Sequence, residues 1–141
     1  MKRLAYISAA SPDLELADME AILRSAIRRN DEMDVTGVLL FNGLNFLQIL
    51  EGDASMVADI YSRIIADKRH SGVVTILDEP ADKRIFPNWS MQLAIVPASV
   101  GSLPAGMQLS KNFLEGLPPA VPDHIRLFLT GFNSMSRLEF A

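Results

Sequence analysis

Three polar side chains stand where the surrounding sequence is apolar, and each could belong to a hydrogen-bond network. Gln48 interrupts "FLQIL", Tyr6 lies within "LAYIS", and Asn30 ends a stretch with helical periodicity. A buried Gln amide carries two donors and two acceptor sites, and leaving them unpaired costs about 1–3 kcal/mol. Gln48 must therefore have partners, and its amide can both donate to them and accept from them.

Each of these residues also has a purely structural interpretation. Gln48 could bond to backbone groups, and Tyr6 could be a core aromatic whose hydroxyl reaches the surface. Asn30 could be the left-handed residue at a helix C-terminus. Trp89 and Met91 in "FPNWSM" would share one face of a regular strand, and both could be core residues. Residue types alone leave both interpretations open.

Composition excludes several other kinds of chemistry. The 141 residues contain no Cys, so disulfides, thiolate metal sites and Cys catalysis are excluded. His70 and His124 have no partners at metal-ligand spacing, and no phosphate-binding loop, dinucleotide fingerprint or nucleophile elbow is present. The net charge is −4 and the basic residues are scattered, which argues against nucleic-acid binding. We therefore do not expect an enzyme.

No segment of the chain indicates a membrane or a secretory route. No apolar run approaches the ~18 residues that a bilayer span needs. The start, "MKRLAYISAASPDLE", lacks the apolar core of a signal peptide. We expect a cytoplasmic protein with no membrane partner.

Hydrophobic periodicity predicts the elements that must position the polar residues. Helices with one apolar stripe each are predicted at 15–29 and 54–67. Apolar runs that suit strands occur at 2–9, 38–41, 45–50, 73–77 and 89–96. The second and third runs form a hairpin around "NG". The order β-α-β-β-α-β-β predicts an α+β, ferredoxin-like fold: a mixed five-stranded sheet with two helices on one face.

The composition changes after Pro97, where Gly, Pro and Ser become frequent. Two short amphipathic helices are predicted in this tail, within "MQLSKNFLEGL" and "PDHIRLFLTGF". The tail could cover the second face of the sheet. We expect the apolar face of "HIRLFLTGF" to pack back on the sheet, and the alternative is that it binds a partner or a second copy of the chain.

Five segments together closely resemble BLUF domains, the blue-light sensors that use flavin. The segments are "LAYIS", "RRNDEMDVTGVLLF", "NFLQILEG", "ADKRH" and "FPNWSM", in matching order and spacing across 2–96. BLUF domains are ferredoxin-like, which agrees with the fold predicted from periodicity. The resemblance implies a short, stand-alone BLUF protein. Residues 1–97 would be the photosensor domain, and 98–141 a C-terminal helical extension for signal output or oligomerisation.

The resemblance implies FAD or FMN, bound non-covalently between the two helices. Tyr6 matches the family's electron and proton donor to the excited flavin, and Gln48 matches the amide between that Tyr and the flavin. Asn30 matches an Asn that hydrogen-bonds the polar edge of the ring. Reversal or tautomerisation of the Gln48 amide would shift the absorption to the red. Photochemistry of the LOV type is impossible because it needs a Cys.

Further cofactor contacts are implied at matched positions. Ile22 and Ile64 match apolar residues that sandwich the ring, and Arg63 matches a basic position near the phosphate. Positions near the ribityl chain and ring are matched by Asp67, Arg69 and His70, and Arg69 also matches a phosphate position.

Other matched positions concern the signal. Ser8 lies on the Tyr6 face of its strand and could tune the network. Trp89 and Met91 match the Trp and Met of the fifth strand, which would pass the signal to the tail. Arg29 departs from the family, which has His or Asn there, and a longer basic side chain could reach the phosphate.

The implied output is a contact with a separate protein, for example a cyclic-di-GMP phosphodiesterase or a transcription regulator. BLUF proteins of this size are often dimers or larger rings, so a homo-oligomer is expected. One alternative is a flavin-free protein of the same fold that acts as an enzyme or binds a small molecule. Another is a degenerate BLUF protein without photochemistry, whose hallmark would be the loss of Tyr6 or Gln48, and both are present.

Overall fold

The fold is known from a computed structural model, which describes residues 1–87, 92–95 and 107–132. Trp89 and Met91 lie outside the described residues. The strands are β1 (Lys2–Ala10), β2 (Thr36–Phe41), β3 (Asn45–Gly52), β4 (His70–Pro80), β5 (Gln92–Ile95) and β6 (Met107–Leu109). The helices are α1 (Leu16–Glu32), α2 (Ala54–Ile65), α3 (Ser110–Glu115) and α4 (Asp123–Phe132).

All six strands belong to one sheet with the order β4-β1-β3-β2-β5-β6. The four strands from β4 to β2 pair antiparallel, whereas β5 runs parallel to β2 and β6 runs parallel to β5. The predicted α+β class is confirmed. The strand count differs from the expected five because "MQL", predicted as the start of a helix, pairs with β5 as β6.

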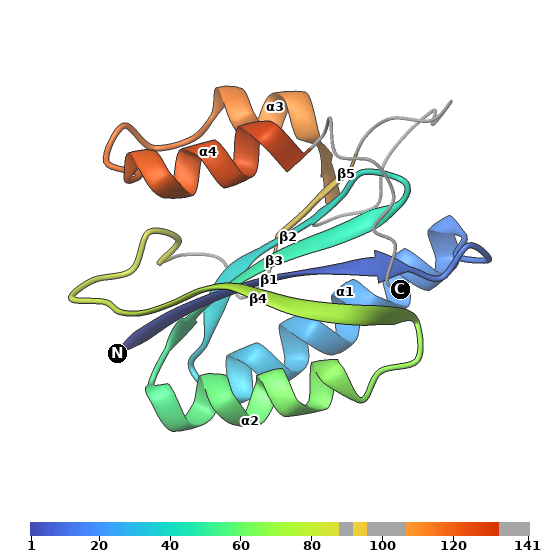
Figure 1. The fold of residues 1–141 in the computed structure, drawn as a ribbon, viewed down its shortest axis with the longest axis horizontal. Coiled ribbons are helices and arrows are strands. Elements are labelled where there is room, and N and C mark those ends of the chain that lie inside the picture. The colour runs from blue at the N-terminus through green and yellow to red at the C-terminus, as the bar shows by residue number, and fades with distance from the viewer. Residues whose placement is uncertain (88–91, 96–106, 133–141) are drawn as a thin grey trace.

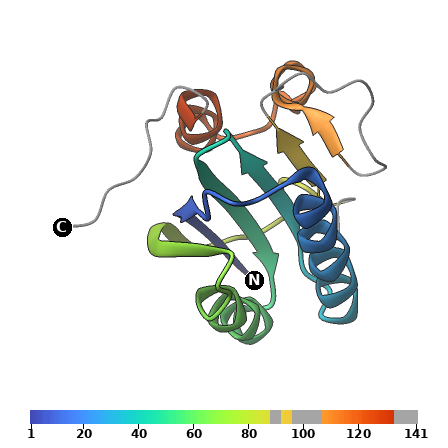
Figure 2. The same ribbon diagram turned by 90° about the vertical axis from the view of Figure 1, so that its right-hand side faces the viewer.

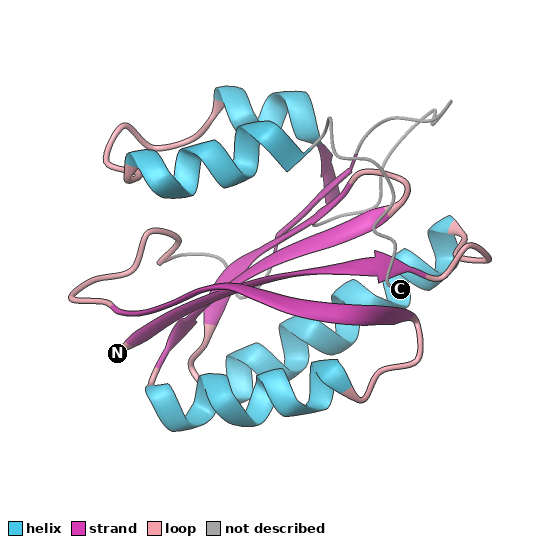
Figure 3. Ribbon diagram, viewed as in Figure 1, coloured by secondary structure: helices cyan, strands magenta, loops and turns pink. Residues whose placement is uncertain are grey.

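Helices cover both faces of the sheet and give the molecule three layers, as Figures 1 and 3 show. Successive strand residues point to opposite faces, so the sheet contributes to two separate cores. Leu4 and Leu50 face α1 and α2, whereas Ala5 and Ile49 face α3 and α4. Figure 2 shows the two helix layers from the end of the sheet.

Helix α4 packs back on the sheet through the apolar stripe that the sequence predicted. Ile125 and Leu129 are fully buried, and Phe132 is 2% exposed in the same core. The opposite side of the helix carries Leu127, which is 70% exposed. Among the described residues, no helix combines the length and the apolar character that crossing a membrane requires.

Helix α1 ends later than predicted, and this changes the interpretation of Asn30. The helix continues to Glu32, and the residue with positive φ is Asp34, at 52°. Asn30 therefore lies within the last turn, and its C=O accepts a hydrogen bond from Val35 N–H at 2.9 Å. The interpretation of Asn30 as a left-handed cap was wrong. Asn30 instead places a fully buried polar side chain within the helix.

The predicted hairpin around Asn42 and Gly43 is present, and its turn is held by the Asn side chain. Asn42 Oδ1 accepts from the N–H groups of Leu44 and Asn45 at 3.0 and 2.7 Å. Gly43 has a φ of 91°, which a residue without a Cβ adopts at little cost. This turn fixes the register of β2 and β3 and therefore the face on which Gln48 lies.

Candidate functional site

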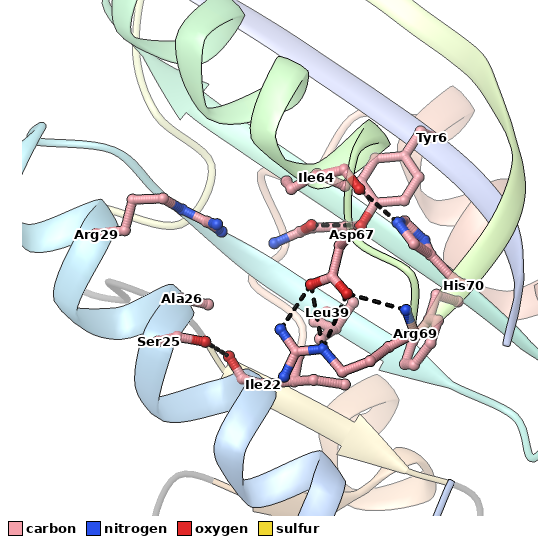
Figure 4. A pocket seen from close by; sticks show the side chains of 12 residues that line it. Tyr6, Ile22, Ser25, Ala26, Arg29, Leu39, Ile64, Asp67, Arg69 and His70 are labelled. Atoms are coloured by element: carbon pink, nitrogen blue, oxygen red, sulfur yellow. Dashed lines mark hydrogen bonds and ion pairs between the residues drawn. The ribbon is translucent and has the colours of Figure 1, made fainter. Parts of the chain in front are cut away.

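A pocket of about 440 Å³, counting the space open to solvent, lies between α1 and α2 over one face of the sheet. Figure 4 shows its side chains arriving from both helices, from the strands beneath and from the segment after α2. The lining residues are Tyr6, Ile22, Ser25, Ala26, Arg29, Leu39, Phe46, Gln48, Ile64, Asp67, Arg69 and His70.

Tyr6 and Gln48 form a hydrogen-bonded pair at the pocket. They are direct partners in the β1–β3 ladder, and each is 3% exposed. The Tyr6 hydroxyl donates to Gln48 Oε1 at 2.6 Å, so the amide oxygen faces the phenol. The two structural interpretations, a Gln bonded only to backbone and a Tyr with its hydroxyl at the surface, do not describe this arrangement.

The environment of Tyr6 keeps its hydroxyl protonated. Burial raises the pKa of Tyr6 far above its ordinary value, while the positive charge of Arg29 acts in the opposite direction. The aromatic rings of Tyr61 and His70 lie beside Tyr6, with centroid separations of 5.7 and 6.0 Å. The phenol can therefore lose its proton readily only if an electron leaves with it or another group changes charge.

Asp67 and Arg69 form a charged pair that lines the pocket beyond the end of α2. Arg69 Nε donates to both carboxylate oxygens of Asp67, at 3.0 and 3.1 Å, and Arg69 Nη2 donates to Oδ2 at 2.6 Å. These hydrogen bonds lower the pKa of Asp67 and raise the pKa of Arg69. Both groups are charged at neutral pH, and both can still turn polar atoms toward a ligand.

His70 and Ser8 form a second polar pair on the same face of the sheet. His70 Nε2 lies 2.6 Å from Ile64 O, which can only accept, so Nε2 carries the proton. His70 Nδ1 lies 2.7 Å from Ser8 Oγ, and in the tautomer with the proton on Nε2 it accepts from that hydroxyl. Ser8 is fully buried. It binds His70, and its predicted effect on the Tyr6 network would have to pass through that ring.

Most of the predicted cofactor residues come together, but two do not line the pocket. Asn30 is fully buried in α1, next to the pocket residue Arg29. Arg63 is 54% exposed and pairs with Asp59 on its own helix. Their predicted contacts with the flavin ring and phosphate stay predictions. So do those of Trp89 and Met91, which the structure does not describe.

Several lining residues were not predicted, and one sequence signal could have found some of them. Leu39 is the ladder partner of Gln48 on β2, so the hairpin register alone places it on the pocket face. Ser25 and Ala26 lie three and four residues after Ile22 on α1, the spacing of one helix face. Phe46 lies two residues before Gln48 on the same strand face.

The pocket suits the flavin that the resemblance implies. Ile22 and Ile64 present apolar side chains from the two helices, as an aromatic ring system requires. Arg29 is half-buried, and its Nε is buried without a hydrogen-bond partner among the described residues. Such a group costs free energy unless a ligand accepts from it. No cluster of three or more His, Cys, Asp or Glu side chains that could hold a metal occurs in the described ranges.

The profile of the BLUF family, described as sensors of blue-light using FAD, matches residues 1–92. The photoactivated adenylate cyclase subunit beta of Euglena gracilis is 37% identical over 143 residues, which cover 96% of this chain and 16% of that protein. The blue light- and temperature-regulated antirepressor BluF of Escherichia coli is 41% identical over 90 residues, 64% of this chain and 22% of that protein. This chain thus spans less than a quarter of either relative.

Solved structures with similar folds agree with the sequence matches. BlrB, a BLUF protein in its dark state, superposes with a TM-score of 0.69 at 27% identity, over 94% of this chain and 95% of that one. Klebsiella pneumoniae BlrP1 with FMN and cyclic diGMP gives a TM-score of 0.74 at 26% identity, over 94% of this chain and 34% of that one. Tyr6 and Gln48 are paired at the pocket, and this chain belongs to the BLUF family of flavin-binding blue-light sensors.

Proposed function

We propose that this BLUF protein senses blue light by proton-coupled electron transfer between Tyr6 and a flavin held in the pocket between α1 and α2. The observation that carries the proposal is the 2.6 Å hydrogen bond from the Tyr6 hydroxyl to Gln48 Oε1 at that pocket. When bound, the flavin, FAD or FMN, supplies the absorption of blue light and a strong oxidant in its excited state. Ile22 and Ile64 would hold its ring, and Arg69 and Asp67 would lie near its ribityl chain.

Tyr6 is the proposed donor of both an electron and a proton. Its high pKa makes loss of a proton alone unfavourable, whereas loss of an electron makes the phenol strongly acidic. Gln48 accepts from Tyr6 in the structure and is the nearest relay for that proton. We propose that the electron and the proton go to the flavin and return to Tyr6 after the Gln48 amide has reversed or tautomerised. No net oxidation then remains, and an amide donor stands beside the flavin where an acceptor stood. This exchange would cause the red shift of the absorption.

A change of one hydrogen bond is a small signal. Its net worth is about 0.5–1.5 kcal/mol, which shifts a two-state equilibrium by roughly tenfold and cannot switch it completely. The responding element must therefore be near balance in the dark. We propose that Trp89, Met91 and β5 form this element, and that the helices of residues 98–141 carry the signal onward.

The proposed output is a contact with a separate effector and not a reaction. A cyclic-di-GMP phosphodiesterase or a transcription regulator is the kind of effector we propose, because related BLUF chains include BlrP1 with cyclic diGMP and the BluF antirepressor. We place this signalling in the cytoplasm and expect a homo-oligomer. Residues 1–97 would act as the sensor and 98–141 as the output extension.

The test is the absorption spectrum of the purified protein in the dark and under blue light. The proposal predicts a yellow protein with bound FAD or FMN and a small red shift that reverses thermally. Protein that is reconstituted with either flavin and shows no shift would contradict it. A stable covalent bond between flavin and protein would also contradict it, because the proposed photochemistry forms no such bond and the chain has no Cys.

A further inference from the structure

Glu51 is a buried carboxylate at the end of β3 that binds backbone instead of solvent. Its side chain is fully buried. It accepts from Ile85 N–H at 2.8 and 3.0 Å, from Phe86 N–H at 2.8 Å and from Arg3 Nε at 3.0 Å. A buried ion pair is weak evidence for stability, because apolar residues of similar volume often replace one without loss. Its clear structural effect is to fix the backbone at residues 85 and 86.

The stretch of residues 83–86, which we call the clamp segment, is also held by two arginines. Arg3 Nη2 donates to Lys83 O at 3.0 Å. Arg84 donates to Thr36 Oγ1 and to the C=O groups of Glu51 and Asp34, at distances of 2.9, 3.1 and 2.7 Å. The clamp segment is therefore tied to β1, β2 and β3 before the chain continues toward β5.

The same cluster reaches both helices on the far face of the sheet. Phe86 is 2% exposed and packs against Phe113 of α3, with ring centroids 6.5 Å apart. Glu79 Oε1 lies 2.9 Å from Arg3 Nη1 and 3.2 Å from His124 Nε2, which belongs to the first turn of α4. Figure 1 shows the loop after β4 on the side of the sheet that α3 and α4 cover.

Two residue pairs of one ladder connect this cluster to the photochemical site. In the β1–β3 pairing, which has no register shift, Tyr6 lies opposite Gln48 and Arg3 lies opposite Glu51. The two pairs are three residues apart, about 10 Å along the strands, and point to opposite faces of the sheet. A displacement of β3 against β1 at Gln48 would therefore also move the Glu51 carboxylate, and with it the clamp segment.

We infer that Glu51 is a positioning residue for the light response: it couples β3, which carries Gln48, to the clamp segment and through it to α3 and α4. The inference rests on the proposed function, in which the helices after residue 98 report the light state. Glu51 itself has no part in the photochemistry, since it lies on the face opposite the pocket.

Hydrogen exchange of the full chain in darkness and under blue light tests this inference. Glu51→Gln keeps the size of the side chain but places an NH₂ group against converging N–H donors. Asp78→Asn makes the same chemical change in a surface ion pair with Lys2, at 3.1 Å, which makes no hydrogen bond to the clamp segment in the described part of the chain. It is the matched control.

We expect Glu51→Gln to bind flavin and to show the wild-type red shift. Its light-minus-dark exchange difference over residues 107–132 falls to less than half of the wild-type value, whereas Asp78→Asn keeps the full difference. If Glu51→Gln does not fold, Glu51→Asp, which keeps the charge but withdraws the carboxylate by one methylene from the N–H groups of Ile85 and Phe86, should show the same reduction.

A full light-minus-dark difference in the folded Glu51→Gln or Glu51→Asp protein would overturn the inference, because a merely structural anchor changes both states alike. A wild-type protein with a red shift but no exchange difference over 107–132 would also overturn it and would leave the photochemistry standing. A wild-type protein without any red shift would instead show that the proposed function itself has failed.

Discussion

The Tyr6 hydroxyl and the Gln48 amide oxygen are joined by a hydrogen bond of 2.6 Å between residues that face each other directly across β1 and β3. The strand registers determine that these two side chains meet. The hairpin turn fixes the register of β3 against β2, and the antiparallel ladder fixes the register of β1 against β3. The pairing of β1 and β3 therefore brings the two side chains together. Predictions about this pair can be tested on the flavin-free protein as well as on the loaded one.

Replacing Gln48 by Leu should lower the free energy of unfolding by about 1–3 kcal/mol, because the buried Tyr6 hydroxyl loses its acceptor. Urea denaturation of the flavin-free protein measures this. The double variant Tyr6→Phe/Gln48→Leu should lose less than the sum of the two single variants, since it removes both polar groups. Additive losses would show that the hydrogen bond is not coupled as the structure has it.

Arg29→Met should weaken flavin binding about tenfold, the effect of one hydrogen bond from a charged donor. Arg29 points toward the pocket in Figure 4, whereas its neighbour Arg28 is exposed, so Arg28→Met is the control. Fluorescence titration with riboflavin, FMN and FAD locates the contact. Equal losses for all three place Arg29 at the ring, and a loss restricted to FMN and FAD places it at the phosphate. Unchanged affinity for every flavin would refute a contact.

The Asp67–Arg69 pair should make stability depend on pH in acid. Hydrogen bonds from Arg69 lower the pKa of Asp67 below its unfolded value of about 3.9. The pair's contribution is therefore present above that value and is lost as the pH falls through the lower folded pKa. Asp67→Asn should cost about 0.5–1 kcal/mol at neutral pH, because the pair is partly exposed, and the difference should shrink toward pH 2. A difference that grows in acid would contradict this sign.

Two glycines, Gly37 in β2 and Gly131 in α4, offer a matched test of how closely β2 and β3 pack. A Cβ on Gly37 would overlap Ile49 O, so Gly37→Ala must push β2 and β3 apart and should cost about 3 kcal/mol or more. A Cβ on Gly131, in α4, meets nothing within 4 Å, so Gly131→Ala should be neutral or stabilise by about 0.5–1 kcal/mol. Thermal unfolding of both variants measures the difference in stability. Equal melting temperatures would contradict the close approach of β2 and β3 at Gly37.

Strong local patterns explain why much of the fold and the site could be predicted. Tyr6 and Gln48 could be identified because each is a polar residue in an apolar strand, where a buried hydrogen-bonding group demands a partner. The apolar stripes of α1 and α2 and the Asn-Gly turn are also local patterns, which predict a helix or a hairpin from neighbouring residues alone. Residues Asp67 to His70 were found by resemblance alone, since nothing in their spacing requires a pocket.

The features that the sequence did not predict depend on contacts between residues that are distant in the chain. Glu51 ends an apolar strand in sequence, where a carboxylate is normally solvated, and its burial depends on Arg3 and on N–H groups more than thirty residues away. Strand β6 was read as helix because three residues carry too little periodicity to decide, and its pairing with β5 is what makes it a strand. The end of α1 was misplaced because Asn30 is a good cap residue by type.

The central claim is tested most directly by the light-minus-dark absorption spectrum of Tyr6→Phe beside that of the wild type, with flavin occupancy measured in both. Phe keeps the ring but removes the hydroxyl that donates to Gln48. The account predicts equal flavin content, a reversible red shift in the wild type and no shift in Tyr6→Phe. A red shift of wild-type size in Tyr6→Phe would contradict the account, because the light response would then not use Tyr6.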